Sequence, residues 1–173
     1  MPAVSEHFKT YRQFASASLV DIYGEHLKDA FKVTANHLES GVWLNETKDG
    51  GAIQLSWQPL PWDAQLSPVN AIASGDFNGD GRTELILAQN HYTNQAETGL
   101  WRGTPGCHLE WDGDRYETVP YPVSGVVTPN DTKAIISLDV NGDGWLDILA
   151  GQNNDALLFF KNVGGNRNPS GSR

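Results

Sequence analysis

The stretch Asp139-Val-Asn-Gly-Asp-Gly-Trp-Leu-Asp147 decides how the rest of the sequence is interpreted. The same pattern stands earlier as Asp76-Phe-Asn-Gly-Asp-Gly-Arg-Thr-Glu84. In each copy, oxygen-bearing side chains occupy positions 1, 3, 5 and 9, and a glycine occupies position 6. Hard cations such as Ca²⁺ are held by several oxygens, which short carboxylates on alternate residues of a tight loop can supply. The pattern therefore predicts two cation-binding loops.

The predicted ligands are the side chains at positions 1, 3, 5 and 9 and the main-chain carbonyl at position 7. Glycine at position 6 permits the backbone turn that brings this carbonyl inward. In the first loop the predicted ligands are Asp76, Asn78, Asp80, Arg82 and Glu84. In the second loop they are Asp139, Asn141, Asp143, Trp145 and Asp147. We expect one Ca²⁺ in each loop.

Two other interpretations fit the pattern less well. Asn-Gly-Asp-Gly could be a plain tight turn, since these residues favour turns without any metal. A turn requires neither acids at positions 1 and 9 nor their repetition, which favours cation loops. An EF-hand would need a Glu at position 12 and flanking helices, but position 12 is Leu87 in one copy and Ala150 in the other. The flanks are short, apolar and rich in branched residues, which indicates β-strands.

Loop and flanking strands together resemble the FG-GAP or VCBS repeat, as in the Leu85-Ile-Leu87 strand that comes after the first loop. Such repeats build the calcium-bearing blades of integrin α-chain propellers and of many bacterial surface proteins. Ser67-Pro-Val-Asn70 and Glu97-Thr-Gly99 are similar to carboxy-terminal blades of bacterial propeller proteins of the cartilage acidic protein type. The resemblance covers about residues 31 to 162. It implies an all-β fold of propeller blades, and it identifies a scaffold rather than an activity.

Composition narrows the class of protein further. The chain has 173 residues, a formal net charge of −9 and one cysteine, Cys107. An acidic chain lacks the basic face that nucleic acid requires, so we expect no nucleic-acid partner. No run is long and apolar enough for a membrane span, and the start lacks the features of a signal peptide. The resemblance implies an extracytoplasmic protein (secreted, periplasmic or at the cell surface), whose export signal we expect on an upstream part.

The amino-terminal part of the chain has a helical pattern instead. Apolar residues recur at three- and four-residue spacing from about Lys9 to Ile22, which predicts an amphipathic helix that covers the core and ends at Gly24. A second short helical piece is expected over Glu25 to Ala30. We therefore expect a helical lead-in over residues 1–30.

Three copies of a β-rich unit come after this lead-in, the first without a metal loop. Hairpins are expected around Lys48-Asp-Gly-Gly51 and Asp112-Gly-Asp114. The strand Ala134 to Leu138 is apolar on both faces, as expected between two neighbouring sheets. The expected domains are the repeats at 31–163, comprising a partial blade at 31–68, a blade at 69–130 and the start of a blade at 131–163, and a polar tail at 164–173. About two and a half blades make a partial propeller, because a closed one has four to eight.

No catalytic constellation is visible in the sequence. The five histidines are scattered without metal-ligand spacing: His7, His26, His37, His91 and His108. The six tryptophans are expected mostly in the core, and the excursion from His91 to Gly106 is the expected binding surface.

Two functions from different classes remain. The first is a non-catalytic, calcium-binding β-propeller segment that acts as a scaffold for adhesion or ligand binding at a cell surface. The second is the scaffold fragment of a carbohydrate-active or other extracellular enzyme. The expected partners are the remaining blades of a longer chain or a second copy of this chain, with a protein or carbohydrate as ligand. The sequence specifies neither that ligand nor the blade number of the full protein.

Overall fold

The computed structural model describes residues 7–165, which divide into two compact units at Leu38 and Glu39. The first unit contains the helices α2 (Tyr11–Ala15) and α3 (Leu19–Tyr23) and the 3₁₀ helix η1 (Gly24–Asp29). The short helical piece expected after Gly24 is therefore confirmed. Of the expected polar tail, residues 166–173 lie outside the described part of the chain, as do residues 1–6 of the lead-in.

The single helix expected from Lys9 to Ile22 is wrong. Two capping boxes explain why two short helices form instead. Thr10 accepts a hydrogen bond from the amide of Gln13 and begins α2, and Ser18 accepts one from the amide of Asp21 and begins α3. A serine in this role offers the backbone a helix start where the periodic pattern predicts a helix interior. Neither helix contains a buried residue, so the expected burial of the apolar stripe is also wrong.

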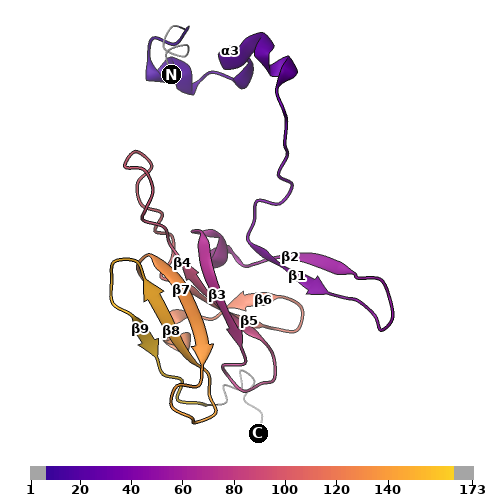
Figure 1. The fold of residues 1–173 in the computed structure, drawn as a ribbon, viewed down its shortest axis with the longest axis vertical. Helices are drawn as coiled ribbons and strands as arrows, with labels where there is room; N and C mark the ends of the chain where they lie inside the picture. Colours follow the sequence, from indigo (N-terminus) through magenta and orange to yellow (C-terminus); the bar gives the residue numbers. More distant parts are fainter. Residues whose placement is uncertain (1–6, 166–173) are drawn as a thin grey trace. The chain divides into compact units, whose positions relative to one another are not determined.

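The second unit is built from three antiparallel sheets (Figure 1). A two-stranded sheet pairs β1 (Gly41–Asn45) with β2 (Leu55–Pro59), around a turn in which Gly51 donates its amide to the Lys48 carbonyl. A short 3₁₀ helix, η2 (Trp62–Gln65), comes next. The stretch from residue 31 to 40, where the repeat pattern was expected to begin, forms neither helix nor strand.

The four-stranded sheet has the order β3-β4-β5-β6 and the three-stranded sheet the order β7-β8-β9. Between β6 and β7 lies the short helix α4 (Tyr121–Ser124). The strand bounds are β3 (Val69–Gly75), β4 (Glu84–Gln89), β5 (Cys107–Trp111), β6 (Tyr116–Thr118), β7 (Thr132–Leu138), β8 (Asp147–Gln152) and β9 (Leu158–Phe160). The strands on both sides of each predicted cation loop are confirmed, and the structure is mostly β.

The two larger sheets repeat one another closely. In the first, Gly75 pairs with Glu84, and the register shifts between Val69 and Ala71. In the second, Leu138 pairs with Asp147, and the register shifts between Thr132 and Ala134. Positions in β7 and β8 lie the same number of residues after their counterparts in β3 and β4 as the second loop lies after the first. The sequence repeat is therefore also a repeat of strand register.

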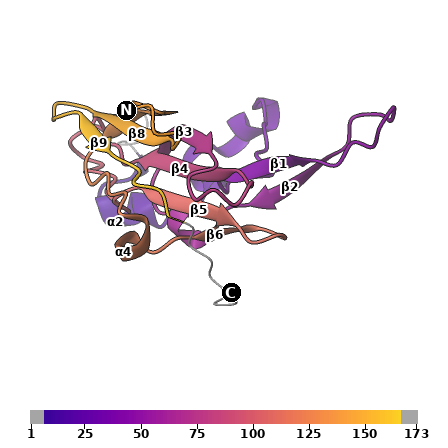
Figure 2. The ribbon, with the colours of Figure 1, turned by 90° about the horizontal axis from the view of Figure 1, so that it is seen from below.

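Both faces of the four-stranded sheet are covered (Figure 2). On one face, Ile86 and Ala88 pack against Ile135, Ile148 and Ala150 of the three-stranded sheet. On the other face, a second cluster joins the sheet to β1 and η2 through the residues Leu85, Leu87, Cys107, Leu109, Leu60, Ala64 and Val42. Every residue of β4 is buried for this reason.

The three-stranded sheet is covered on one face only. Ile135 is 6% exposed, whereas its neighbour Ile136 on the opposite face is 54% exposed. The expectation that this strand is sandwiched between two sheets is therefore wrong for the described chain. The tryptophans were also wrongly expected in the core: Trp43, Trp62 and Trp101 are exposed, and the other three are half-buried. In the described residues, the three sheets do not close into a ring.

Candidate metal centre

The first loop is folded around the carboxylate of Asp76. Its Oδ1 accepts hydrogen bonds from the amides of Gly79 (2.7 Å) and Asp80 (3.1 Å), and its Oδ2 accepts one from the amide of Gly81 (2.8 Å). Asn78 Oδ1 accepts from the Asp80 amide at 2.8 Å. The position 1 side chain therefore lies inside the loop and fixes the path of the backbone.

Position 5 of this loop continues the same pattern. Asp80 Oδ1 accepts a hydrogen bond from the amide of Arg82, the position 7 residue, at 2.8 Å. The guanidinium of Arg82 turns outward and donates to the carbonyl of Trp111. Asp76 Oδ2, Asn78 Oδ1 and Asp80 Oδ1 each accept one loop amide and therefore keep a second lone pair. Four of the five predicted ligand residues of the first loop thus lie along one tight turn.

The second loop repeats this geometry bond for bond. Asp139 accepts from the amides of Gly142 (2.7 Å) and Gly144 (2.8 Å), and Asn141 Oδ1 accepts from the Asp143 amide (3.0 Å). Asp143 Oδ1 accepts from the amide of Trp145 at 3.0 Å. The Gly144 amide is the main reason that the pKa of Asp139 lies below its usual value, against the opposing effect of burial. The loop amides therefore favour a charged carboxylate in the absence of any cation.

Position 9 is where the two loops differ. Asp147 is fully buried; its Oδ2 accepts from the amide of Val140 (3.1 Å) and its Oδ1 from the amide of Asn162 (2.8 Å). Glu84 is also buried, and its Oε2 accepts from the equivalent amide, Phe77, at 3.0 Å. Its Oε1 has no hydrogen-bond partner among residues 7–165. Asp147 thus has a main-chain amide donating to each of its two oxygens, whereas Glu84 has one donating to Oε2 only.

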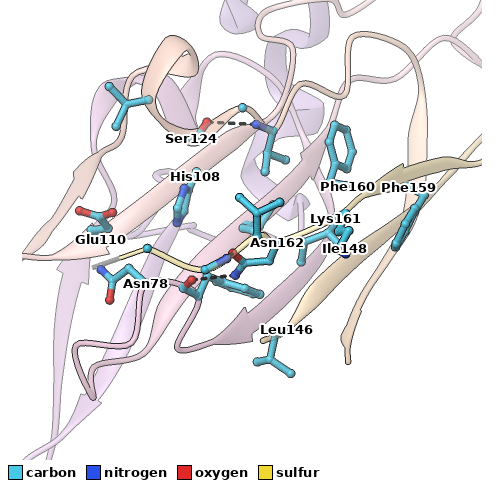
Figure 3. Close-up of a pocket in the computed structure, with 18 residues that line it drawn as sticks. Asn78, His108, Glu110, Ser124, Leu146, Ile148, Phe159, Phe160, Lys161 and Asn162 are labelled. Atoms are coloured by element: carbon cyan, nitrogen blue, oxygen red, sulfur yellow. Dashed lines mark hydrogen bonds between the residues drawn. The ribbon is translucent and has the colours of Figure 1, made fainter. Parts of the chain in front are cut away.

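Glu84 instead joins two residues that the sequence analysis did not associate with it. In Glu84, His108 and Glu110, one ligand atom from each side chain lies within 4.8 Å of the other two. Among the described residues, the acids of neither loop form such a group of three among themselves. His108 and Glu110 line a cavity of about 440 Å³ between the two larger sheets (Figure 3). His108 and Glu110 alternate on one strand, but only the register across the long connection from β4 to β5 brings them to Glu84.

The two predicted cation loops are in contact with one another. A Cβ atom placed on Gly79 would lie 2.8 Å from the Trp145 ring, and one placed on Gly164 would lie 2.5 Å from the same ring. The ring of Trp145 therefore lies against a glycine of the first loop and a glycine after β9. Asn162 Nδ2 also donates to the carbonyl of Phe77, at position 2 of the first loop, at 2.8 Å.

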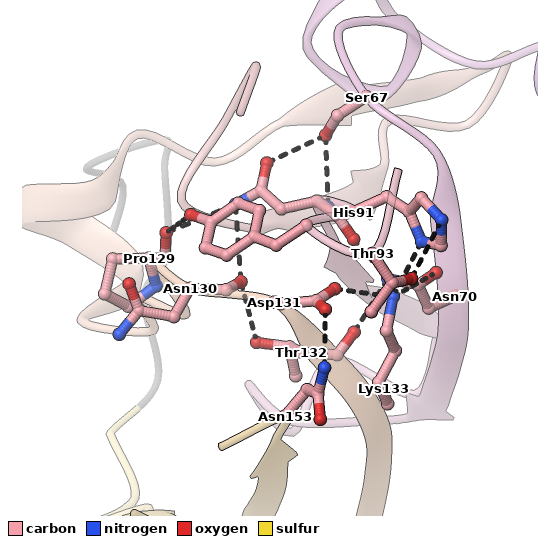
Figure 4. Close-up of polar contacts among 12 residues, drawn as sticks. Ser67, Asn70, His91, Thr93, Pro129, Asn130, Asp131, Thr132, Lys133 and Asn153 are labelled. Atoms are coloured by element: carbon pink, nitrogen blue, oxygen red, sulfur yellow. Dashed lines mark hydrogen bonds and ion pairs between the residues drawn. The ribbon is translucent and has the colours of Figure 1, made fainter. Parts of the chain in front are cut away.

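A polar network lies at the opposite ends of β3 and β7 from the loops (Figure 4). The ammonium of Lys133 lies 2.5 Å from Asp131 Oδ1 and 2.9 Å from His91 Nδ1, and Asn70 Nδ2 donates to the carbonyl of Thr132. Burial opposes the charge of Asp131, but hydrogen bonds from Lys133 and Asn153 outweigh it and lower the pKa. The network ties the two larger sheets together at this end.

The excursion from His91 to Gly106 begins at this network and protrudes from β4 (Figure 1). A bridge between His91 and Trp101 closes it, with both amide-to-carbonyl distances at 2.9 Å. Arg102 stacks over the ring of Tyr92, 4.9 Å from its centroid. Most residues between Thr93 and Gly103 are exposed.

Comparison with known proteins agrees with the loop geometry in one part of the chain. Residues 69–99, which contain β3, the first loop and β4, match the family model of the FG-GAP repeat. This match defines a class of repeat and covers one of the two loops. No curated protein and no solved structure matches the chain. In the described residues, no helix has the length and apolar character needed to cross a membrane.

Proposed function

We propose that this chain is a non-catalytic, calcium-binding segment of a β-propeller, which acts as a scaffold for adhesion or ligand binding at a cell surface. The repeated loop carries this proposal. The two loops make the same set of side-chain to amide hydrogen bonds, and the first lies within the FG-GAP match. Two identical loop geometries on equivalent strands favour a shared role over two coincidental turns.

The donor chemistry of both loops suits a hard cation. Ca²⁺ would be held by carboxylate, amide and carbonyl oxygens, which are the ligands it prefers. In the first loop the residues are Asp76, Asn78, Asp80, Arg82 and Glu84, and in the second they are Asp139, Asn141, Asp143, Trp145 and Asp147. A bound Ca²⁺ would neutralise acids that otherwise repel one another within a short turn. The role of the ion is then to brace the hairpin.

The scaffold role rests on two surfaces. The open face of the three-stranded sheet exposes Ile136 and Phe159, whereas Ile135 on the covered face is buried. A further blade, from a longer chain or from a second copy, would cover such a face in a propeller. The protruding excursion from His91 to Gly106 is free to contact a protein or carbohydrate. The extracytoplasmic location is part of the same proposal and is supported by the class of repeat.

Calcium should raise the thermal stability of the chain. A ligand that binds only the folded state adds about 2.7 kcal/mol per site at a hundredfold excess over its Kd. The test is a thermal melt of the full chain in chelator, then in millimolar Ca²⁺ and in millimolar Mg²⁺. We expect a higher midpoint in Ca²⁺ and a smaller effect of Mg²⁺, because Mg²⁺ requires a tighter octahedral arrangement.

A double variant, Asp80→Asn with Asp143→Asn, provides the control. Each asparagine keeps the Oδ1 acceptor for the position 7 amide but removes one charge from its loop. The variant should lose the calcium-dependent part of the midpoint and keep the midpoint measured in chelator. An unchanged midpoint of the wild-type chain in Ca²⁺ and in chelator would refute the metal assignment.

A further inference from the structure

A row of acids runs across one face of the four-stranded sheet. Register places Ile86 opposite His108 and Glu110 opposite Glu117. Side chains at alternate positions share a face, so Glu84, Glu110 and Glu117 form a row across β4, β5 and β6, with His108 beside it. This face is the one that packs towards the three-stranded sheet.

Like charges directly opposite one another destabilise a sheet. At the outer end of the row, Arg115 forms an ion pair with Glu117 and offsets its repulsion with Glu110. The inner end has no such cation: Glu84 is 1% exposed and His108 is 8% exposed. Glu84 Oε1 and both ring nitrogens of His108 lack hydrogen-bond partners in the part of the chain that the structure describes. His108 Nε2 lies 3.4 Å from Glu84 Oε2, an ion-pair distance without hydrogen-bond geometry. Buried polar groups of this kind require a partner.

The second sheet shows that the fold itself does not need these residues. By register, the counterparts of Glu84, His108 and Glu110 are Asp147, Phe159 and Lys161. The three-stranded sheet thus carries an apolar ring and a cation where the four-stranded sheet carries an imidazole and a second acid. Asp147 has both oxygens satisfied by main-chain amides. Of these two sets of residues, only Glu84, His108 and Glu110 of the four-stranded sheet therefore include a buried carboxylate oxygen and imidazole without partners.

We propose that Glu84, His108 and Glu110 form a site for a divalent transition metal of the Zn²⁺ type, separate in chemistry from the calcium loops. One imidazole nitrogen and two carboxylates are ligands that Zn²⁺ accepts, whereas Ca²⁺ prefers oxygen alone. One ligand atom from each residue lies within 4.8 Å of the others, which is close enough to share one ion. The cavity of about 440 Å³ that His108 and Glu110 line leaves room for a further ligand on the ion.

The site would also connect the two kinds of metal. Glu84 accepts the amide of Phe77 inside the first loop with one oxygen, and its other oxygen belongs to the buried group. The alternative is that these three side chains bind no metal. The two arrangements differ in whether Zn²⁺ binds, so a titration of the chain with Zn²⁺ distinguishes them.

The test uses the full chain with its loops saturated by millimolar Ca²⁺, titrated with Zn²⁺ in a calorimeter and with Co²⁺ in an absorption spectrometer. We expect one Zn²⁺ per chain, and a Co²⁺ spectrum with the intense visible bands of a four- or five-coordinate ion. Glu110→Gln and His108→Gln should each weaken Zn²⁺ binding by at least about 100-fold. A residue that only supports a metal ligand would cost less than this when it is replaced. Glu110 is half-buried, so its amide variant keeps the size and packing of the side chain.

Two controls keep the test interpretable. Glu117→Gln lies in the same row but outside the group, and His91→Gln removes a histidine at the other end of the sheets; both should bind Zn²⁺ like the wild type. The Asp80→Asn and Asp143→Asn double variant should lose Ca²⁺ and retain Zn²⁺, so the failure of one site is distinguishable from failure of the other. Equal Zn²⁺ affinity in the wild type and in Glu110→Gln, or no Zn²⁺ binding by the wild type, would overturn the proposal.

Discussion

Gly79 and Gly142 occupy the same position in the two loops and have the same backbone conformation, with φ of 78° and 75°. Only Gly79 is close to another side chain, because Trp145 lies against it. Gly142→Ala should therefore cost about 1–2 kcal/mol, the strain of a left-handed alanine. Gly79→Ala should cost about 1–3 kcal/mol more, the penalty of overpacking, since the Trp145 ring also lies close to Gly164.

Urea unfolding of both variants in saturating Ca²⁺ measures this difference. The two alanines have the same intrinsic strain, so the comparison isolates the contact with Trp145. Equal losses of unfolding free energy in the two variants would show that the indole ring does not pack on the first loop.

Asp131 should make the stability of the chain depend on pH in acid. Its folded pKa lies below the ordinary 3.8: burial opposes the charge, but the hydrogen bond from Lys133 outweighs it. A lowered folded pKa contributes stability above the unfolded pKa, and this contribution is lost as pH falls through the folded pKa. Asp131→Asn should thus destabilise by about 2 kcal/mol near neutral pH, a typical value for a hydrogen bond to a charged group.

The measurement is the difference in unfolding free energy between wild type and Asp131→Asn as a function of pH. The difference should shrink steadily once pH is below 3.8. Asp114→Asn removes an acid at an exposed turn and is measured alongside as a control for the change of formal charge. A difference that stays constant down to the acid limit would mean that Asp131 is not held as a charged group.

At the scale of residues, the turn of each loop follows from a local pattern, whereas its metal ligands stay a prediction. Asp76 and Asp139 are near in sequence to the amides they bind, so a local pattern is sufficient. His108 and Glu110 could not be associated with Glu84 in this way. Their proximity depends on the register between β4 and β5, which are joined by a long connection whose length fixes no register. The tryptophans were misplaced because the exposure of a large aromatic side chain in a strand, a loop or a 3₁₀ helix has no local signature.

At the scale of elements, the two loops should bind Ca²⁺ with different affinity, the second more tightly. Asp147 is fixed in the second loop by two main-chain amides, whereas one oxygen of Glu84 belongs to the group with His108. The extra methylene of Glu84 also loses more rotamer freedom on ordering. A ligand held in place before binding contributes more affinity than one that must be ordered.

Calorimetric titration of Asp80→Ala and Asp143→Ala with Ca²⁺ ranks the two sites. Asp80→Ala should keep the tighter binding event, and Asp143→Ala should keep only the weaker one. Retention of the tighter event by Asp143→Ala would reverse the ranking while leaving both sites in place.

The strands were predicted more reliably than the helices, and the reason is local. A cation loop fixes where the strands on both sides end and begin, so β3, β4, β7 and β8 result directly from the motif. In the helical lead-in, the apolar spacing is continuous through Ser18, but that serine caps a new helix. Periodicity does not distinguish a serine inside a helix from a serine that begins one.

At the scale of the whole molecule, the open face of the three-stranded sheet should drive self-association. Ile136, Leu149 and Phe159 form a cross-strand row on this face, and Phe159 is 48% exposed. An apolar sheet face without a covering layer favours contact with another surface. Phe159→Ser should therefore reduce association without lowering the melting midpoint, because the side chain is outside the buried clusters.

Light scattering after size exclusion, in Ca²⁺, measures the mass of the wild type and variants. Leu100→Ser removes a side chain of similar exposure, 55%, from the protruding excursion and should leave the mass unchanged. A wild-type chain that elutes as a monomer of 18.9 kDa would contradict this prediction.

The hydrogen bond from Asn162 to Phe77 has a consequence for how the chain is made. It joins residues 85 positions apart, so Asn162 is synthesised long after the first loop that it contacts. In a nascent chain whose Asn162 and Gly164 are still inside the ribosome, the first loop lacks the hydrogen bond from Asn162. The Trp145 ring then also lacks its contact with Gly164. Chains stalled on either side of this point should differ in protease cleavage within the first loop, with protection arriving in a single step. Both loops therefore wait for the same residue, because the amide of Asn162 also donates to Asp147 of the second loop.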